Sequence, residues 1–297
     1  MHGNQFLTVQ VDYVAIASVI LCILPAILTV AVILREARQR QAERKHPFKE
    51  LKRRPAGESL RLKIESLDES IDDRVMLLVA GPIVLAGTAV TTRLHGLIAC
   101  LLLLTISLIW TLSLKNGLSR LLKERKDYRL GFDGERYVGE ELSRLIVHGF
   151  EIYHDVPFDC FNMDHVLVGK QGVFVVETKT RSKPVNKAGD KEFRVLFNGS
   201  ALRWPWGEEQ KDVEQARNNA ATLSIWLTKA VGQSVKVSSI LTLPGWWIER
   251  SVPSNDLHVL NPKEITRIND LKSVFLDQEM VRRICYQLDQ KCRMGVE

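Results

Sequence analysis

The apolar positions of this chain follow two different patterns. In the first 115 residues they form three long runs, at 14–34, 75–92 and 96–114, with polar and basic segments between them. Further along, apolar residues alternate with polar ones or recur at helical spacing, which is typical of a soluble α/β domain. The pattern therefore predicts a membrane part followed by a soluble part.

Each run is near the length of about 20 residues that a helix needs to cross a bilayer. The run at 14–34 has no charged residue, and its leader lacks the basic start of a cleaved signal peptide, which is the alternative for this run. Only residues 93–95 separate the second run from the third, which predicts a helical hairpin. We therefore expect about three transmembrane helices.

Basic residues indicate on which side of the membrane each loop lies. Twelve Lys or Arg lie between Arg35 and Arg74 and five between 115 and 126, whereas the hairpin tip has only Arg93. The positive-inside rule then predicts a multi-pass protein of the cell (inner) membrane with a cytoplasmic C-terminal domain. The predicted spans make the lipid bilayer an expected partner. The basic half of the loop is more simply a solvated linker helix, with contact to anionic lipid headgroups as the alternative.

Helices and strands alternate in the soluble part. A helix is predicted from an N-cap at Asp133 to Gly149, and a longer one over 208–231. Strands are predicted at 151–157, in the two arms of a hairpin over 164–179, and at 192–197, 202–206, 235–243 and 257–260, with closing helices at 262–268 and 273–292. This order predicts an α/β fold with a mixed sheet flanked by helices.

The same pattern divides the chain into six parts. They are a leader with the first transmembrane helix (1–34), a cytoplasmic basic linker (35–74), a transmembrane hairpin (75–114), a basic linker (115–127), a soluble domain (128–260) and a C-terminal helical extension (261–297). The five cysteines show no CxxC spacing, which argues against a zinc site or a disulfide framework.

The candidate chemistry lies in the hairpin DHVLVGKQGVFVVETK, Asp164 to Lys179. With Gly169–Gly172 as a four-residue turn, Asp164 faces Glu177 across an antiparallel pair, with Cβ atoms about 4.5–5.5 Å apart. Lys179 points to the same face as Glu177, because strand side chains alternate. Opposed carboxylates are destabilising unless a cation lies between them, so the hairpin predicts a divalent-metal site with a catalytic lysine.

Two carboxylates at a strand pair suit Mg²⁺ or Mn²⁺, which prefer oxygen ligands. Such an ion lowers the pKa of bound water and stabilises charge on a phosphoryl group, which is the chemistry of phosphodiester hydrolysis. A third carboxylate, Glu135, lies three residues before Val138 on the apolar stripe of its predicted helix. A buried carboxylate there needs a partner or a metal. An exposed position in the first helical turn is the alternative.

Two segments carry a family resemblance. The pattern G-x-x-G-E-x-x-V-x-x-x-L at Gly131–Leu142, followed by MDHVLVGKQGVFVVETK, resembles the nuclease-related domain (NERD) of the PD-(D/E)xK nuclease superfamily, over roughly residues 128–260. The resemblance implies a restriction-endonuclease-like fold. It also implies that Asp164 and Glu177 bind the metal and that Glu135 completes the metal shell.

The resemblance further implies that Lys179 is the catalytic lysine of the ExK triplet and that Gln215, on the helix after it, contacts nucleic acid or substrate. Thr180 departs from the family, which often has Asn at this position. Six basic residues lie between Arg181 and Arg203, and among them Arg181 and Lys183 are predicted substrate contacts. Four tryptophans are candidates for stacking on bases, with core or rim packing as the alternative: Trp204, Trp206, Trp246 and Trp247.

These features favour a membrane-anchored, Mg²⁺-dependent nuclease that acts on DNA at the cytoplasmic face. The alternative is a non-catalytic membrane scaffold that uses the same fold to bind nucleic acid or protein. A transporter is disfavoured, because Arg93 is the only Lys, Arg, Asp or Glu between Val75 and Leu114, and an ion path is expected to carry intramembrane charge.

Overall fold

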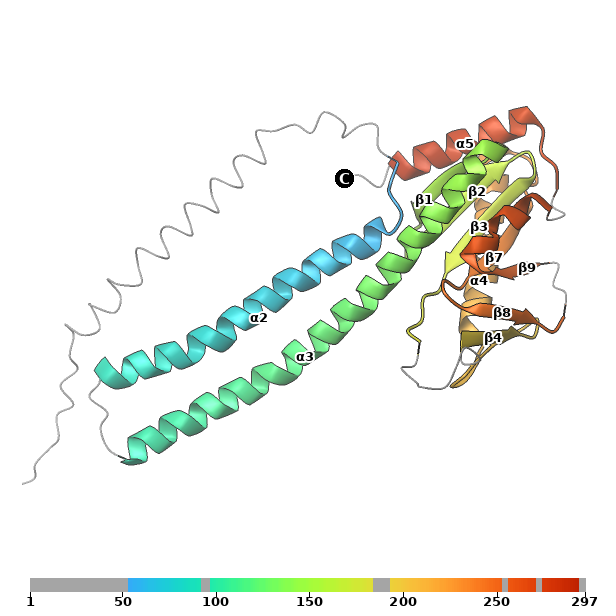
Figure 1. The fold of residues 1–297 in the computed structure, drawn as a ribbon. Coiled ribbons are helices and arrows are strands. Elements are labelled where there is room, and N and C mark those ends of the chain that lie inside the picture. The colour runs from blue at the N-terminus through green and yellow to red at the C-terminus, as the bar shows by residue number, and fades with distance from the viewer. Residues whose placement is uncertain (1–52, 92–96, 184–192, 253–255, 271–273, 294–297) are drawn as a thin grey trace, which may run out of the picture. The chain divides into compact units, whose positions relative to one another are not determined.

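The computed structural model describes residues 53–91, 97–183, 193–252, 256–270 and 274–293 (Figure 1). The first predicted transmembrane helix, at 14–34, lies outside the described residues. The chain divides into two compact units. We call them the helical unit, whose described part falls within Ser66–Glu124, and the α/β unit, which combines Arg53–Glu65 with Arg125–Glu297.

The helical unit is made of parts of two long helices, α2 (Glu58–Thr91) and α3 (Leu97–Leu142). Within this unit the Trp110 indole donates a hydrogen bond to the Leu77 carbonyl at 3.2 Å. Large apolar side chains of both helices are exposed, and Ile98 reaches 77%. Exposed apolar surface of this kind marks a contact with lipid or with another protein.

Among the described residues, one helix is long and apolar enough to cross a membrane, and it is α3. The predicted pair of membrane helices at 75–114 is therefore not supported in full. The apolar part of α2 begins only at Val75, after a charged half of the same helix, and its described part ends at Thr91. That stretch is shorter than the roughly 20 residues of a span and contains Pro82.

The predicted helix start at Asp133 is wrong, because α3 continues without a break from Leu97 to Leu142. The basic linker expected at 115–127 is part of this helix. Its Leu, Lys, Arg and Glu residues are strong helix formers and override the N-cap signal of Asp133. Consequently Glu135 lies in the interior of a long helix and not in a first turn.

The α/β unit contains a five-stranded sheet in the order β1-β2-β3-β7-β9. Its strands are β1 (Glu151–Pro157), β2 (Asn162–Gly169), β3 (Gly172–Thr178), β7 (Val237–Thr242) and β9 (Leu257–Leu260). The first three strands are antiparallel, whereas β3, β7 and β9 are parallel. The sheet is therefore mixed, as predicted. The predicted hairpin register is also confirmed, with Val166 opposite Val175 and Val168 opposite Val173.

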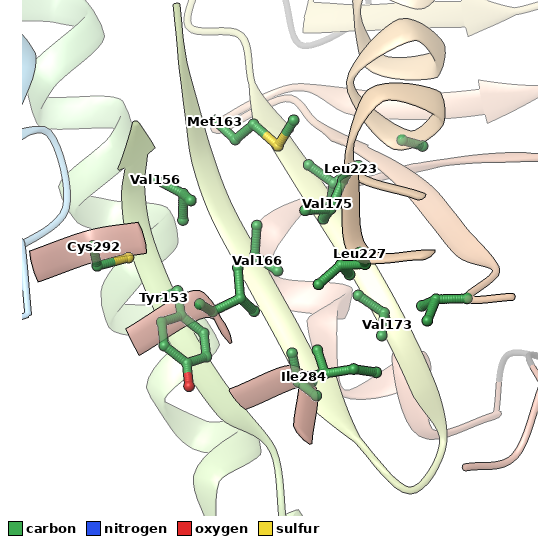
Figure 2. Close-up of a cluster of buried hydrophobic side chains, with 14 of the residues drawn as sticks. Tyr153, Val156, Met163, Val166, Val173, Val175, Leu223, Leu227, Ile284 and Cys292 are labelled. Carbon is green, nitrogen blue, oxygen red and sulfur yellow. The ribbon is translucent and has the colours of Figure 1, made fainter. Parts of the chain in front are cut away.

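Helices cover both faces of this sheet. On one face, Val173 and Val175 pack with Leu223 of α4 (Lys211–Val231) and Ile284 of α5 (Gln278–Arg293), as Figure 2 shows. On the other face, Phe174 and Val176 pack with the end of α3 and with the short helices η1 (Ser143–His148) and η3 (Pro262–Asp270). Successive side chains of a strand point to opposite faces, so the continuous apolar run Val173–Val176 allows β3 to be buried on both sides.

A second, four-stranded sheet has the order β6-β5-β4-β8. Its strands are β4 (Arg194–Phe197), β5 (Leu202–Trp204), β6 (Gly207–Glu209) and β8 (Trp247–Arg250). Two of these strands differ from the sequence prediction. Glu208 lies in β6 and not at the start of the long helix, and β8 was not predicted. The expected C-terminal extension is part of the domain, because α5 packs into the core of the first sheet.

Candidate active site

The candidate site is built at the end of β3, where the buried strand leaves the sheet. Asp164 lies in β2 and Glu177 in β3, and Lys179 follows directly after β3. The Thr178 amide donates a hydrogen bond to Asp164 Oδ2 at 2.7 Å, which ties the two strands beyond their last paired residues. The hairpin therefore brings the two predicted acids and the lysine together, as the register requires.

The Glu177 carboxylate is almost fully buried, with 2% exposure, and three side chains donate to it. Lys179 Nζ lies 2.8 Å from Oε1, Gln215 Nε2 lies 2.7 Å from the same oxygen, and Asn219 Nδ2 lies 2.7 Å from Oε2. Gln215 and Asn219 are four residues apart on α4, so their side chains share one face of the helix. Gln215 also accepts a hydrogen bond from Lys179 Nζ at 3.0 Å.

Gln215 therefore holds both members of the Glu177–Lys179 pair, and its contact with nucleic acid or substrate stays a prediction. Asn219 is a site residue that the sequence prediction missed. Its spacing of four from Gln215 is the one local signal that points to it.

Glu135 approaches from α3 and is also buried, with 8% exposure. No hydrogen bond or ion pair connects it to another described residue. Burial, together with the charges of Asp155 and Glu177, raises the pKa of Glu135 from its usual 4.5 to about 8, against the opposing effect of Lys179. Glu135 is therefore protonated at neutral pH in the absence of a cation.

The other charged groups of the site respond to the same environment. Burial raises the pKa of Asp164 well above its usual value, and the charges of Glu177 and Glu135 act in the same direction. Burial also raises the pKa of Glu177, although Lys179 opposes this. For Lys179 burial alone would lower the pKa, but the surrounding carboxylates outweigh it and raise the pKa, so this side chain stays cationic.

The donor set suits a hard cation in its chemistry but not in its present arrangement. The site has three carboxyl groups, and the charge of Glu177 raises the pKa of the other two, Glu135 and Asp164. Carboxylate oxygens are the ligands that Mg²⁺ and Mn²⁺ prefer. However, within the described residues no group of three His, Cys, Asp or Glu side chains is arranged to hold a metal. Lys179 and Gln215 both donate to Glu177 Oε1, whereas among the described residues Oε2 accepts only from Asn219, so Oε2 keeps a lone pair for a metal.

A further buried acid, Asp155, supports the α3 side of the site. It has 1% exposure and a φ of 48°. Its Oδ2 atom accepts from the Ser59 amide at 3.1 Å and lies 2.9 Å from Arg54 Nη2, while Oδ1 accepts from Asn162 Nδ2 at 3.0 Å. Residues 53–65, predicted as part of a basic linker, are thus part of the scaffold of this site.

The predicted substrate contacts Arg181 and Lys183 follow the site along the chain. Arg181 Nη2 lies 3.1 Å from Glu209 and 2.9 Å from Asp212, so its charge is paired within the domain. Lys183 Nζ lies 4.2 Å from the centroid of the Phe193 ring. The four tryptophans separate into two groups. Trp204 and Trp246 are buried, whereas Trp206 and Trp247 are exposed at 54% and 68%.

A cavity of about 860 Å³ opens beside the site. It is lined by Gly134 and Tyr137 of α3, by Thr180, and by Trp246 and Trp247. Gly134 is required here, because a Cβ atom would lie 1.8 Å from Thr180 Oγ1. That oxygen is buried and has no hydrogen-bond partner among the described residues. The departure from the family at Thr180 therefore lies in the wall of this cavity.

Residues 130–244 match the family model of the nuclease-related domain (NERD), which supports the resemblance noted from the sequence. The matched region includes Glu135, Asp164 and the Glu177–Lys179 pair. It also includes Gln215 and Asn219, whose side-chain amides contact Glu177. No curated protein and no solved structure matches the chain.

Proposed function

We propose that this protein is a membrane-anchored, metal-dependent nuclease that hydrolyses DNA at the cytoplasmic face. One observation carries the proposal: the region that matches the nuclease-related domain encloses a buried Glu177–Lys179 pair, and the charge of Glu177 adds to burial in raising the pKa of both Asp164 and Glu135. A nuclease-related domain favours a nucleic acid as substrate. Anchoring is supported by the exposed apolar length of α3 and by the basic residues that flank it.

In this proposal Asp164, Glu177 and Glu135 hold Mg²⁺ or Mn²⁺. The ion supplies a water of lowered pKa and a Lewis acid for the phosphoryl oxygens. Lys179 acts as a cation, because its raised pKa keeps the ammonium group protonated. It neutralises charge that develops on the phosphate in the transition state. Gln215 and Asn219 position Lys179 and Glu177 and do not bind the metal.

The test uses the full-length protein in detergent or nanodiscs, incubated with DNA and Mg²⁺ or Mn²⁺. We expect cleavage that EDTA abolishes, and a loss of at least about 100-fold in Asp164→Asn and Lys179→Ala. Glu140→Gln is the matched control, because Glu140 lies on α3 with an exposed side chain. Absence of cleavage of any DNA form, or equal cleavage by Asp164→Asn, would overturn the proposal.

The second candidate function is a non-catalytic scaffold that binds nucleic acid or protein at the membrane. The observation that favours it is the complete set of donors around Glu177, which stabilises this carboxylate without a metal. In the same experiment, DNA binding without hydrolysis under every metal condition would select this function.

A further inference from the structure

The cavity beside the site begins at Thr180, one residue beyond the proposed catalytic lysine. It lies entirely within the α/β unit, between α3 and the Trp246–Trp247 segment. Its volume of about 860 Å³ falls within the range of about 300–1,000 Å³ that is usual for sites of small organic ligands. A ligand of one or two nucleotides is of this size.

The charges that line the cavity favour an anion. Lys183, Lys263 and Arg194 line it, and Asp133 is the only acid among its lining residues. Asp133 is paired with Arg129 at 3.2 Å and Arg194 with Glu249 at 2.6 Å. Lys183 and Lys263 therefore remain to attract a phosphate backbone.

Trp247 adds a flat apolar surface to these cations. It lies on β8 with 68% exposure, whereas its neighbour Trp246 is buried and packs against Trp204 and Trp206. Trp247 makes no ring contact with another aromatic side chain of the described residues. A large aromatic side chain that contributes so little to the core is suited to stacking on a ligand base.

Stacking on a protein side chain requires a base that is out of the duplex. In a double helix both faces of a base are covered by its neighbours, so Trp247 can reach only an unpaired base or one at a frayed end. We propose that this cavity binds an unpaired base of single-stranded nucleic acid against Trp247, with the adjoining phosphates at Lys183 and Lys263. The proposal rests on the proposed function and specifies its substrate as single strands or frayed ends.

The experiment measures the binding of a fluorescent oligothymidine and of a blunt duplex of equal length to the full-length protein, by anisotropy without divalent metal. We expect the single strand to bind at least about tenfold more tightly. Trp247→Ala should weaken single-strand binding by about 5- to 150-fold, and Trp247→Phe should restore part of the loss. Lys263→Ala should reduce the slope of the logarithm of the binding constant against the logarithm of the salt concentration by about one unit, which corresponds to the loss of one phosphate contact.

Trp206→Ala is the matched control, because Trp206 is exposed but does not line the cavity. It should change the affinity less than twofold. Equal affinity for both DNA forms, or full single-strand affinity in a folded Trp247→Ala variant, would refute the inference. The readout does not need hydrolysis. If the protein binds single strands through Trp247 but never cleaves, the proposed function fails and this inference stands. If Trp247→Ala cleaves DNA as well as the unchanged protein, this inference fails and the proposed function stands.

Discussion

The two sides of the candidate site treat a buried carboxylate in opposite ways. At the end of β3, Glu177 receives one ammonium and two amide donors. On α3, Glu135 is almost as buried, but no described residue donates to it, and its pKa rises to about 8. The sheet side is therefore complete as it stands, whereas the α3 side requires a proton or a cation. A metal would therefore change the protonation of Glu135, on the α3 side, more than that of Glu177.

The largest effect on stability is expected from the sheet side. Asn219→Leu removes the donor from Glu177 Oε2 and leaves a buried carboxylate oxygen without a partner. We expect a loss of about 2–4 kcal/mol in the free energy of unfolding, measured by denaturation of the full-length protein in detergent. Asn218→Leu is the matched control, since Asn218 is exposed on the same helix. Equal losses in the two variants would show that Glu177 does not depend on Asn219.

A smaller effect of opposite sign is expected on the α3 side. The folded pKa of Glu135 is about 8 against a usual 4.5, so the folded state holds more protons between these values. Its stability therefore falls as pH rises through this window. Glu135→Gln removes this dependence, and we expect the variant to be about 1–3 kcal/mol more stable than the unchanged protein at pH 8.5 in EDTA.

The measurement is the thermal midpoint at several pH values between 5 and 9, with Glu140→Gln as the exposed control on α3. The two proteins should converge near pH 5, where Glu135 is protonated. A Glu135→Gln variant that is less stable at every pH would show that a favourable contact of the carboxylate outweighs the cost of burying it.

The smallest effect is expected from the metal itself. At pH 8, Mg²⁺ or Mn²⁺ at about ten times its Kd should stabilise the protein by about 1.4 kcal/mol. The shift should shrink in Glu135→Gln and disappear in Asp164→Asn, and it should persist in Asn218→Leu. Calorimetry on the same variants provides the affinity. An unchanged metal shift in Asp164→Asn would place the ion elsewhere in the protein.

The hairpin could be predicted from sequence because its information is local. The glycines at 169 and 172 and the alternating valines determine the register, and the register places Asp164 beside Glu177. The start of the helix at Asp133 could not be predicted, because a capping residue resembles any exposed acid within a long helix. The match at 130–244 agrees with the resemblance, but it does not extend to the helical unit.

The partners of the buried acids could not be predicted either. Asn219 contacts Glu177 across 42 residues and Ser59 contacts Asp155 across 96, and no local pattern encodes such contacts. The tryptophans show the same limit. Composition made all four equal candidates for stacking, and only the packing of the second sheet distinguishes the buried Trp204 and Trp246 from the exposed pair.

The contacts of Arg53 and Arg54 have a consequence for the boundaries of the domain. Arg54 pairs with Asp155 in β1, and Arg53 pairs with Asp289 in the last helix at 3.0 Å. A fragment that begins near residue 126 would leave Asp155 buried without its counter-charge. Because Arg53 lies beside α5, a circular permutant could attach residues 53–65 after the C-terminal helix through a short linker. Such a rewired chain would keep the complete α/β unit and dispense with the apolar helices between its two pieces.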